Sequence, residues 1–460
     1  MNATALFLVP MARAASLEAT HGRGMAIADA LLTELGGGLT PEPHPYGKTV
    51  CARLPGALLW PRPSVRPAVA TKIREGNLMK LERLPALELA DRARMAPPSQ
   101  EAMIPFRGVP TLPMPEHVVE AARTAAGEVF PRRGRGSAPL RQAIASHLAA
   151  AYGLTVDPEG ELLITHGAQH GMSVALRALL SPGDEVVVPA PSYFFDGMIR
   201  LAGARPVYVP SDESRGWDHV PAAVEAAITP ATRALLLCNP NNPTGYVPGR
   251  ERLSGLLDIA ARHGLTVFSD ESYERYVWDG PGYVPQMLLR ERHPDLVTVT
   301  SLSKNYAFTS WRIGYVHAPA HLLEPIHHAF EWDAINVGDV AQAAAHAVMT
   351  GPQDWIEQEL ATMRARRDIL RAGLERAGLA SVRPDAGVFV FVDCAPLGFR
   401  GRRLERLLLD HGVTAIAGDA FAGPDTHIRM VYGGSAADLE EAGRRLTGLA
   451  RREARPALVE

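Results

Sequence analysis

Short apolar segments alternate with helical patterns along the middle of the chain. Residues 140–151 and 172–180 have the apolar spacing of helices. Mostly apolar strands are predicted at 162–164, 185–188, 206–209, 234–237, 265–268 and 297–300. Strands of this kind, separated by helices, indicate a mostly parallel sheet that is covered on both faces. The sequence therefore predicts an α/β fold, in which ligands bind beyond the carboxyl ends of the strands.

The first 69 residues follow a different pattern. A short helix is predicted at 25–35, and it ends at the three glycines of 36–38. Prolines then recur at positions 41, 43, 45, 55, 61, 63 and 67, a density that breaks both helices and sheet ladders. We therefore expect residues 1–69 to form a proline-rich N-terminal arm that carries no chemistry of its own.

Composition narrows the class of protein. Of the 460 residues, 47% are hydrophobic and 21% are charged, which is typical of a globular chain. The formal net charge is −3, so no basic excess points to nucleic acid. A spanning helix would need about 18 consecutive apolar residues, and the sequence contains no such stretch. The three cysteines are too few for a disulfide framework or a zinc site, so we expect a cytoplasmic protein without a bound metal.

Lysine is rare in this chain, and one lysine stands apart from the others. Only four of the 47 basic residues are lysines, and Lys304 is the only one after Lys80. Arginine can replace lysine as a charge, but its guanidinium cannot act as a condensing amine. The isolated Lys304 therefore indicates a chemical role at that position.

Small and polar residues follow several of the predicted strands. After residue 164, Ala168 and Gln169 open a helix, where backbone N–H groups can face a phosphate or simply form a turn. After residue 188 comes Tyr193, which suits either a cover for a flat ring or a packed position in the core or at a subunit contact. The run Cys-Asn-Pro-Asn-Asn-Pro-Thr-Gly at 238–245 is more specific than a structural turn requires.

Two further strand ends carry charged groups. Asp270 directly follows an apolar strand, where a carboxylate is costly to desolvate unless it meets a cation. We expect that cation to belong to a ligand. After residue 300, the side chains of Ser301, Ser303, Lys304 and Arg312 place two hydroxyls, an amine and a guanidinium within twelve residues. Such a set suits a phosphate together with a reactive carbonyl.

Taken in order, these segments resemble the class I/II aminotransferase family of fold-type I pyridoxal-phosphate-dependent enzymes. The order is Gly-Ala-Gln, Pro-x-Tyr, Asn-Pro-x-Asn-Pro-Thr-Gly, Asp-Glu-x-Tyr, Ser-x-Ser-Lys and an arginine eight residues after the lysine. The resemblance implies a large domain at 118–355, which binds pyridoxal 5′-phosphate, and a smaller α+β domain formed by 70–117 and 356–460. It also implies a homodimer with the active site at the interface.

The same resemblance implies roles for the residues around the cofactor ring. Lys304 forms the Schiff base with pyridoxal 5′-phosphate and moves the proton between the substrate Cα and the cofactor. Asp270 keeps the pyridine nitrogen protonated, so that the ring accepts electrons released at Cα. Tyr273 and Asn242 hydrogen-bond the 3′-oxygen, and Tyr193 stacks on the ring face.

Two anionic groups complete the implied site. The cofactor phosphate is held by Ala168, Gln169, Ser301, Ser303 and Arg312. The α-carboxylate of the substrate is bound by Arg429, in the segment 426–432, together with Asn242 and with the chain near Gly108. These residues would fix the two ends of the substrate–cofactor pair.

Two departures from the family pattern concern the substrate. Where many relatives have a tyrosine that reaches the partner subunit's phosphate, this chain has Arg132, Arg133 and Arg135. We expect at least one of these arginines to reach the partner's active site, whereas the alternative is a solvated loop. The segment 332–339, expected to approach that site across the dimer, has no arginine, so a preference for aspartate or glutamate is in doubt.

These features predict an aminotransferase that transfers an amino group between an amino acid and a 2-oxo acid by a ping-pong mechanism. One alternative keeps the cofactor and changes the reaction to that of a lyase, cyclase or oxidase. Such an enzyme would act on a specialised amino acid in secondary metabolism, for example by elimination or replacement at its β or γ carbon. A second alternative is a non-enzymatic sensor fused to a DNA-binding module, but residues 1–69 contain no basic helix-turn-helix pattern.

Overall fold

The computed structural model describes residues 38–44, 47–53, 81–95, 104, 112–128 and 134–453. By its contacts the chain divides into two units, Met1–Lys80 and Leu81–Glu460. Among the described residues, no helix combines the length and the apolar character needed to cross a membrane. The helix predicted at 25–35 lies outside the described residues.

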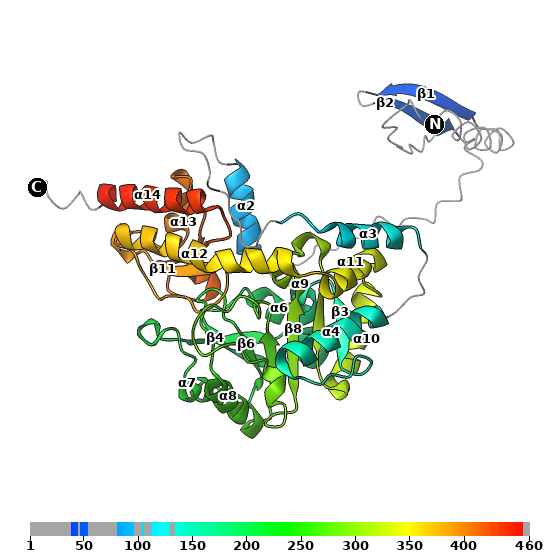
Figure 1. The fold of residues 1–460 in the computed structure, drawn as a ribbon, viewed down its shortest axis with the longest axis horizontal. Helices are drawn as coiled ribbons and strands as arrows, with labels where there is room; N and C mark the ends of the chain where they lie inside the picture. The colour runs from blue at the N-terminus through cyan, green and yellow to red at the C-terminus, as the bar shows by residue number, and fades with distance from the viewer. Residues whose placement is uncertain are drawn as a thin grey trace, which may run out of the picture. The chain divides into compact units, whose positions relative to one another are not determined.

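The first unit contains a β-hairpin, formed by β1 (Gly38–His44) and β2 (Gly47–Arg53) (Figure 1). The two strands pair antiparallel, although Pro41 and Pro43 lie within β1. The proline density predicted that no sheet ladder would form here, and the hairpin corrects that expectation. Because the two prolines are two residues apart, their missing N–H donors fall on one edge of the strand, and a two-stranded ribbon leaves one edge unpaired.

The second unit is built on a seven-stranded sheet in the order β3-β9-β8-β7-β6-β4-β5. Every strand except β9 runs in the same direction, because β9 pairs antiparallel with both β3 and β8. The predicted α/β fold with a mostly parallel sheet is therefore confirmed. The strands are β3 (Leu162–Thr165), β4 (Glu185–Ala190), β5 (Arg205–Pro210), β6 (Thr232–Cys238), β7 (Thr266–Asp270), β8 (Leu296–Ser301) and β9 (Gly314–His317).

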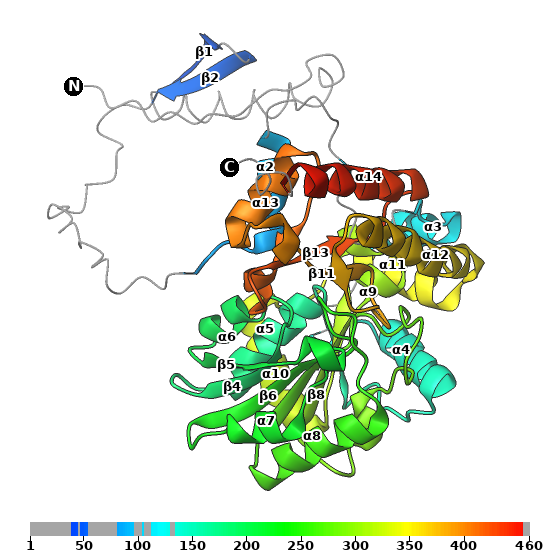
Figure 2. The same ribbon diagram turned by 90° about the vertical axis from the view of Figure 1, so that its left-hand side faces the viewer.

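Helices cover both faces of the large sheet (Figure 2). The helices of this part of the chain are α3 (Glu116–Ala126), α4 (Ala138–Tyr152), α5 (Ala168–Leu179), α6 (Asp196–Leu201), α7 (Pro221–Ala226), α8 (Arg250–Arg262), α9 (Leu302–Asn305), α10 (Ala320–Ala334) and α11 (Asp339–Thr350). Figure 2 shows α7 and α8 over one face, while α5 and α10 pack together over the other. Since both faces are covered, the strands are apolar on both sides, which is the pattern seen in the sequence.

A second, four-stranded antiparallel sheet follows in the order β10-β11-β13-β12. Its strands are β10 (Ala380–Ser381), β11 (Phe389–Asp393), β12 (Ile416–Ala417) and β13 (His427–Val431), and it is accompanied by α2 (Pro85–Met95), α12 (Asp354–Arg376), α13 (Gly401–Asp410) and α14 (Ala436–Glu453). Short 3₁₀ helices are η3 (Glu213–Arg215), η4 (Gln286–Leu289), η5 (Thr309–Trp311), η6 (Ala395–Leu397) and η7 (Gly418–Phe421). A separate apolar core lies beneath this sheet, so the two sheets are packed independently.

Candidate active site

One cavity of about 240 Å³ brings together most of the residues that the sequence singled out. Its lining includes Ala168, Gln169, Tyr193, Asn242, Asp270, Tyr273, Ser301, Ser303, Lys304, Arg312 and Arg429. These residues lie at or after the carboxyl ends of strands in the large sheet, apart from Arg429, which lies in β13 of the second sheet. The cavity therefore lies where the two sheets meet. Gly108, the remaining member of the predicted set, lies outside the described residues.

Lys304 lies in α9, the single helical turn that follows β8. The pKa of its amine is lowered to about 8, mainly because burial disfavours the charged form. The guanidinium groups of Arg429 and Arg312 act in the same direction, and the carboxylate of Asp270 opposes them. A substantial fraction of the amine is therefore neutral at mildly alkaline pH, and the neutral form is the nucleophile and base.

Asp270 is the last residue of β7. Its Oδ1 accepts hydrogen bonds from the backbone N–H of Ser272 at 3.0 Å and from the Ser272 hydroxyl at 2.6 Å. Burial raises the pKa of Asp270, while the Ser272 bonds and the charge of Lys304 lower it. Within the described ranges, Asp270 forms no ion pair with an arginine or lysine side chain. A ligand cation at this carboxylate would offset its desolvation.

Several hydrogen-bond donors converge at one end of the cavity. The Arg312 Nη1 donates to Ser303 Oγ and to the Thr309 carbonyl oxygen, each at 3.1 Å. The helix α5 begins here, so its first N–H groups have no partner within the helix. Gly167, which precedes α5, has φ +82°, and a Cβ at this position would lie 2.7 Å from Arg312 Nη2. A dianion such as a phosphate matches this set of donors.

Arg429 is enclosed by aromatic rings and lacks one hydrogen-bond partner. Its Nη1 donates to Asn242 Oδ1 at 3.1 Å, which joins the second sheet to the loop after β6. The guanidinium carbon lies 4.8 Å from the ring centre of Phe421, 5.7 Å from that of Phe194 and 5.9 Å from that of Phe389. Arg429 is only 6% exposed, and within the described structure its Nε has no partner. A buried cation with an unused donor favours an anionic ligand.

The loop after β6, which carries Asn242, is held by its own polar side chains. Asn241 Oδ1 accepts a hydrogen bond from the Thr244 hydroxyl at 2.7 Å, and Asn241 Nδ2 donates to the Pro191 carbonyl oxygen at 3.1 Å. The backbone N–H of Asn239 donates to the carbonyl oxygen of the last β7 residue at 2.9 Å. The segment 238–245 thus forms a loop that holds Asn242 beside Arg429.

Some residues that line the cavity were missed in the sequence. They are Ala86, Phe194, Cys238, Ser272, Thr309, Phe389 and Val431. Ser272 and Thr309 lie within the recognised motifs, so a hydroxyl beside a motif aspartate or arginine was an available signal. Ala86 and Phe389 lie far from every motif and reach the cavity through tertiary packing. No local sequence pattern predicts such packing.

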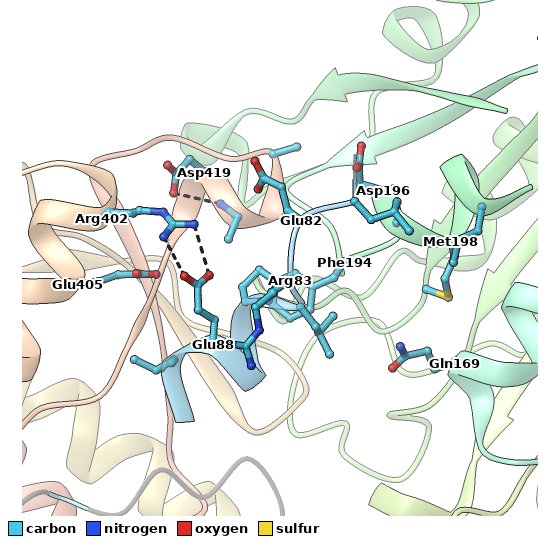
Figure 3. Close-up of a pocket in the computed structure, with 18 of the residues that line it drawn as sticks. Glu82, Arg83, Glu88, Gln169, Phe194, Asp196, Met198, Arg402, Glu405 and Asp419 are labelled. Carbon is cyan, nitrogen blue, oxygen red and sulfur yellow. Dashed lines mark hydrogen bonds and ion pairs between the residues drawn. The ribbon is translucent and has the colours of Figure 1, made fainter. Parts of the chain in front are cut away.

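A second cavity, of about 530 Å³, adjoins the first and shares Gln169 and Phe194 with it (Figure 3). One wall is α2, the same helix that contributes Ala86 to the first cavity. Figure 3 shows Arg402 of α13 facing Glu88 of α2, and their charged groups form an ion pair at 2.9 Å. The helix α2, which lines both cavities, is thereby connected to α13.

Comparison with known proteins agrees with this geometry. Residues 107–446 match the family described as aminotransferase class I and II. The chain is 34% identical over 341 residues to the probable aspartate/prephenate aminotransferase of Thermus aquaticus, which covers 73% of this chain and 88% of that protein. It is 35% identical over 358 residues to the arginine–pyruvate transaminase of Pseudomonas aeruginosa, covering 75% of this chain and 89% of that protein.

Solved structures give the same result. The aspartate aminotransferase from Thermus thermophilus with maleate is similar with a TM-score of 0.74 and 30% identity, covering 81% of this chain and 100% of that chain. The chain therefore belongs to the class I and II aminotransferase family. The resemblance inferred from the motifs, the fold and the predicted aminotransferase activity are confirmed.

Proposed function

We propose that the protein uses pyridoxal 5′-phosphate, bound at Lys304, to exchange an amino group between an amino acid and a 2-oxo acid. One observation carries the proposal. The amine of Lys304, with a pKa of about 8, shares one cavity with the carboxylate of Asp270 and the guanidinium groups of Arg312 and Arg429. This set provides a reactive amine, a partner for a cationic ring, and partners for a phosphate and a carboxylate.

The residues present fit this cofactor. When bound, the cofactor supplies an aldehyde that condenses with amines and a ring that draws electrons from the substrate Cα. The donors at the start of α5, with two serine hydroxyls and a guanidinium, would hold its phosphate, and the other residues would hold its ring. The proposed set is Ala168, Gln169, Ser301, Ser303 and Arg312 for the phosphate, Asp270 for the ring nitrogen, Tyr193 for the ring face, and Asn242 and Tyr273 for the 3′-oxygen.

The chain's own groups then perform the proton transfers and the orientation of the substrate. In this proposal Lys304 Nζ takes the proton from the substrate Cα and later returns it, and a pKa near ambient pH favours transfer in both directions. Arg429 would bind the α-carboxylate through its unused Nε, with Asn242 fixing the guanidinium. The rings of Phe194 and Phe389 exclude water from this end, which strengthens the charge interactions there.

We also propose that the protein is a homodimer. Trp332 is 94% exposed, Ile335 59% and Val340 38%, and the three lie where α10 ends and α11 begins. Exposed apolar side chains gathered in one segment favour a protein partner. The family resemblance implies that the segment 332–339 approaches the partner's active site, so a second copy of this chain is the proposed occupant.

The remaining proposals concern the arginine loop, the domains and the location. Arg135 Nη1 donates to the Glu159 carbonyl oxygen of its own chain at 2.9 Å, while Arg132 and Arg133 lie outside the described residues. The contact of one of these arginines with the partner's site stays a prediction. The division of the chain into a large domain at 118–355 and a small domain formed by 70–117 and 356–460 also stays a prediction. The two separate sheets support it. A cytoplasmic location is supported by two buried, unpaired cysteines, Cys238 and Cys394.

Product analysis tests the proposed reaction. The purified protein, loaded with pyridoxal 5′-phosphate, is incubated with pairs of amino acids and 2-oxo acids, and all four compounds are quantified by mass spectrometry. The panel includes aspartate and arginine, the amino acids in the names of the relatives. Amino transfer requires both substrates and forms a new amino acid and a new 2-oxo acid in equal amounts. Turnover with the amino acid alone, with release of ammonia, would instead favour the lyase or oxidase alternative.

A further inference from the structure

Three consecutive residues outside the cavity form hydrogen bonds with the helical turn that carries Lys304. The Tyr276 hydroxyl donates a hydrogen bond to the carbonyl oxygen of Lys304 at 2.9 Å. Arg275 Nη1 donates to the carbonyl oxygen of Asn305 at 3.1 Å. Glu274 Oε1 accepts a hydrogen bond from Asn305 Nδ2 at 2.9 Å. Three neighbouring side chains are thus bonded to two neighbouring residues of the lysine turn.

The Glu274–Asn305 contact is buried and the other two are partly buried, so water has limited access to them. Tyr276 is fully buried, Asn305 is 1% exposed and Glu274 is 7% exposed. The guanidinium of Arg275 also lies over the ring of Tyr306, 4.9 Å from its centre. A hydrogen bond lost in such surroundings leaves its partner unsatisfied, and the turn would have to move to find a new one.

The lysine turn depends on this outside support because α9 is only four residues long. A single helical turn fixes several backbone dihedrals for very few hydrogen bonds and is not stable by itself. Its entry is fixed, since β8 pairs with β7 in the sheet. Its exit is fixed by the residues 274–276, which continue from the end of β7. Asp270 and Tyr273, both in the cavity, lie on that same continuous segment.

We propose that Glu274, Arg275 and Tyr276 are positioning residues that hold the amine of Lys304 in register with Asp270. The inference rests on the role of Lys304 in the proposed function. None of the three lines the described cavity, so they act on the reaction through the turn. A displaced amine transfers protons slowly, whereas the groups that bind the substrate carboxylate remain in place. The expected effect is therefore on kcat and not on KM.

Tyr276→Phe tests the proposal against a matched variant, Tyr432→Phe. Tyr432 is also fully buried, in the same apolar core, and its hydroxyl donates to the Gly387 carbonyl oxygen at 2.6 Å, away from the lysine turn. Both variants lose a phenol–carbonyl bond, and Tyr432→Phe also loses the bond that its hydroxyl accepts from Trp278 Nε1 at 3.0 Å, so both should lower the melting temperature. We expect Tyr276→Phe alone to lower kcat by roughly tenfold or more, with KM changed less than about twofold.

A second pair of variants covers the case in which Tyr276→Phe does not fold. Glu274→Gln keeps an oxygen that accepts from Asn305, whereas Glu274→Ala removes it. We expect near-normal kcat for the glutamine variant and a loss of about tenfold for the alanine variant. A further measurement uses the cofactor-free protein, in which borohydride fixes added pyridoxal 5′-phosphate to Lys304. The rate of this fixation, followed by peptide mass spectrometry, should fall in the same variants that lose kcat.

Equal changes of kcat and fixation rate in Tyr276→Phe and Tyr432→Phe would show that the contact serves only stability, and would overturn the proposal. This result would not affect the proposed function if the wild-type protein transfers amino groups. Absence of amino transfer by the wild-type protein would instead contradict the proposed function. The fixation rates would still decide whether residues 274–276 position Lys304.

Discussion

In the proposed function, the protonation of Lys304 determines when the site can react. Its pKa is lowered to about 8, and the neutral fraction of the amine grows as the pH rises through that value. We predict that the cofactor-free protein captures pyridoxal 5′-phosphate faster as the pH rises, with a midpoint near 8. Arg312→Met should move the midpoint upward because it removes a neighbouring positive charge, and Asp270→Asn should move it downward. Stopped-flow capture rates between pH 6 and 10 measure this, and a midpoint above 10, as in a free lysine, would contradict it.

Asp270 is expected to matter for the chemical step more than for cofactor capture. Asp270→Asn removes the charge that stabilises a cationic ring but keeps a side chain of nearly the same shape. We predict that the variant still captures pyridoxal 5′-phosphate and that removal of the Cα proton slows by about a hundredfold or more. Single-turnover rates with Cα-deuterated and ordinary amino acid measure this step.

Ser272→Ala is the control for Asp270→Asn, because it deletes the 2.6 Å hydroxyl bond and leaves the carboxylate charged. Its loss of rate should be much smaller. If Asp270→Asn kept the single-turnover rate of the wild-type protein, the carboxylate would have no part in stabilising the ring.

Among individual residues, the sequence predicted those that belong to motifs and missed those that arrive by packing. Asp270 ends β7, and Lys304 and Arg312 lie in the segment after β8, so their side chains were expected at one edge of the sheet, and the cavity contains all three. The aromatic enclosure of Arg429 was not predicted. Phe389 lies on the neighbouring strand β11 and Phe421 in η7 just before β13, while Phe194 follows β4 of the large sheet, so tertiary packing brings the three rings together.

At the scale of elements, α2 lines both cavities and is held by charged contacts. Arg402 of α13 pairs with Glu88 of α2. We predict that Arg402→Ala loosens α2 and raises the KM for amino acids by roughly two- to fivefold, with kcat little changed. The effect is small because the arginine side chain is 65% exposed, and exposed ion pairs contribute less than about 1 kcal/mol.

Arg406→Ala provides the matched control on the same helix. Arg406 pairs with Asp410 within α13 at 3.2 Å, is 77% exposed and makes no ion pair with α2. Steady-state kinetics of the two variants, at low and high salt, give the comparison. Equal KM values for both variants would mean that the ion pair between Arg402 and Glu88 does not influence substrate binding.

The sequence predicted elements well where a pattern is local. The strands of the large sheet other than β9, and the helices α4 and α5, were expected, because their periodicity is contained within a few residues. β9 was missed, since it has only four residues, directly after the motif that ends at Arg312, and it is defined by pairing with two distant strands. The hairpin in residues 38–53 was missed because proline density was taken to exclude a ladder.

At the scale of the whole molecule, the exposed apolar segment between α10 and α11 predicts an obligatory partner. Trp332→Glu places a charge where we propose that a second copy packs, so the variant should shift from dimer to monomer and lose most of its activity. Light scattering after size-exclusion chromatography measures the mass. Leu87→Glu, at an exposed leucine of α2 (60% exposed), is the control and should remain a dimer. A monomeric wild-type protein with full activity would contradict the proposed interface.

The half-reaction tests the central claim most directly. The loaded protein is mixed with an amino acid that it accepts, without any 2-oxo acid, and the released 2-oxo acid is counted against the concentration of active sites. The account predicts one equivalent per site, then no further release until a second 2-oxo acid is added. Lys304→Arg should release none, because the guanidinium keeps the charge but cannot act as the amine. Continuous release without a second substrate, or one equivalent from Lys304→Arg, would contradict the account.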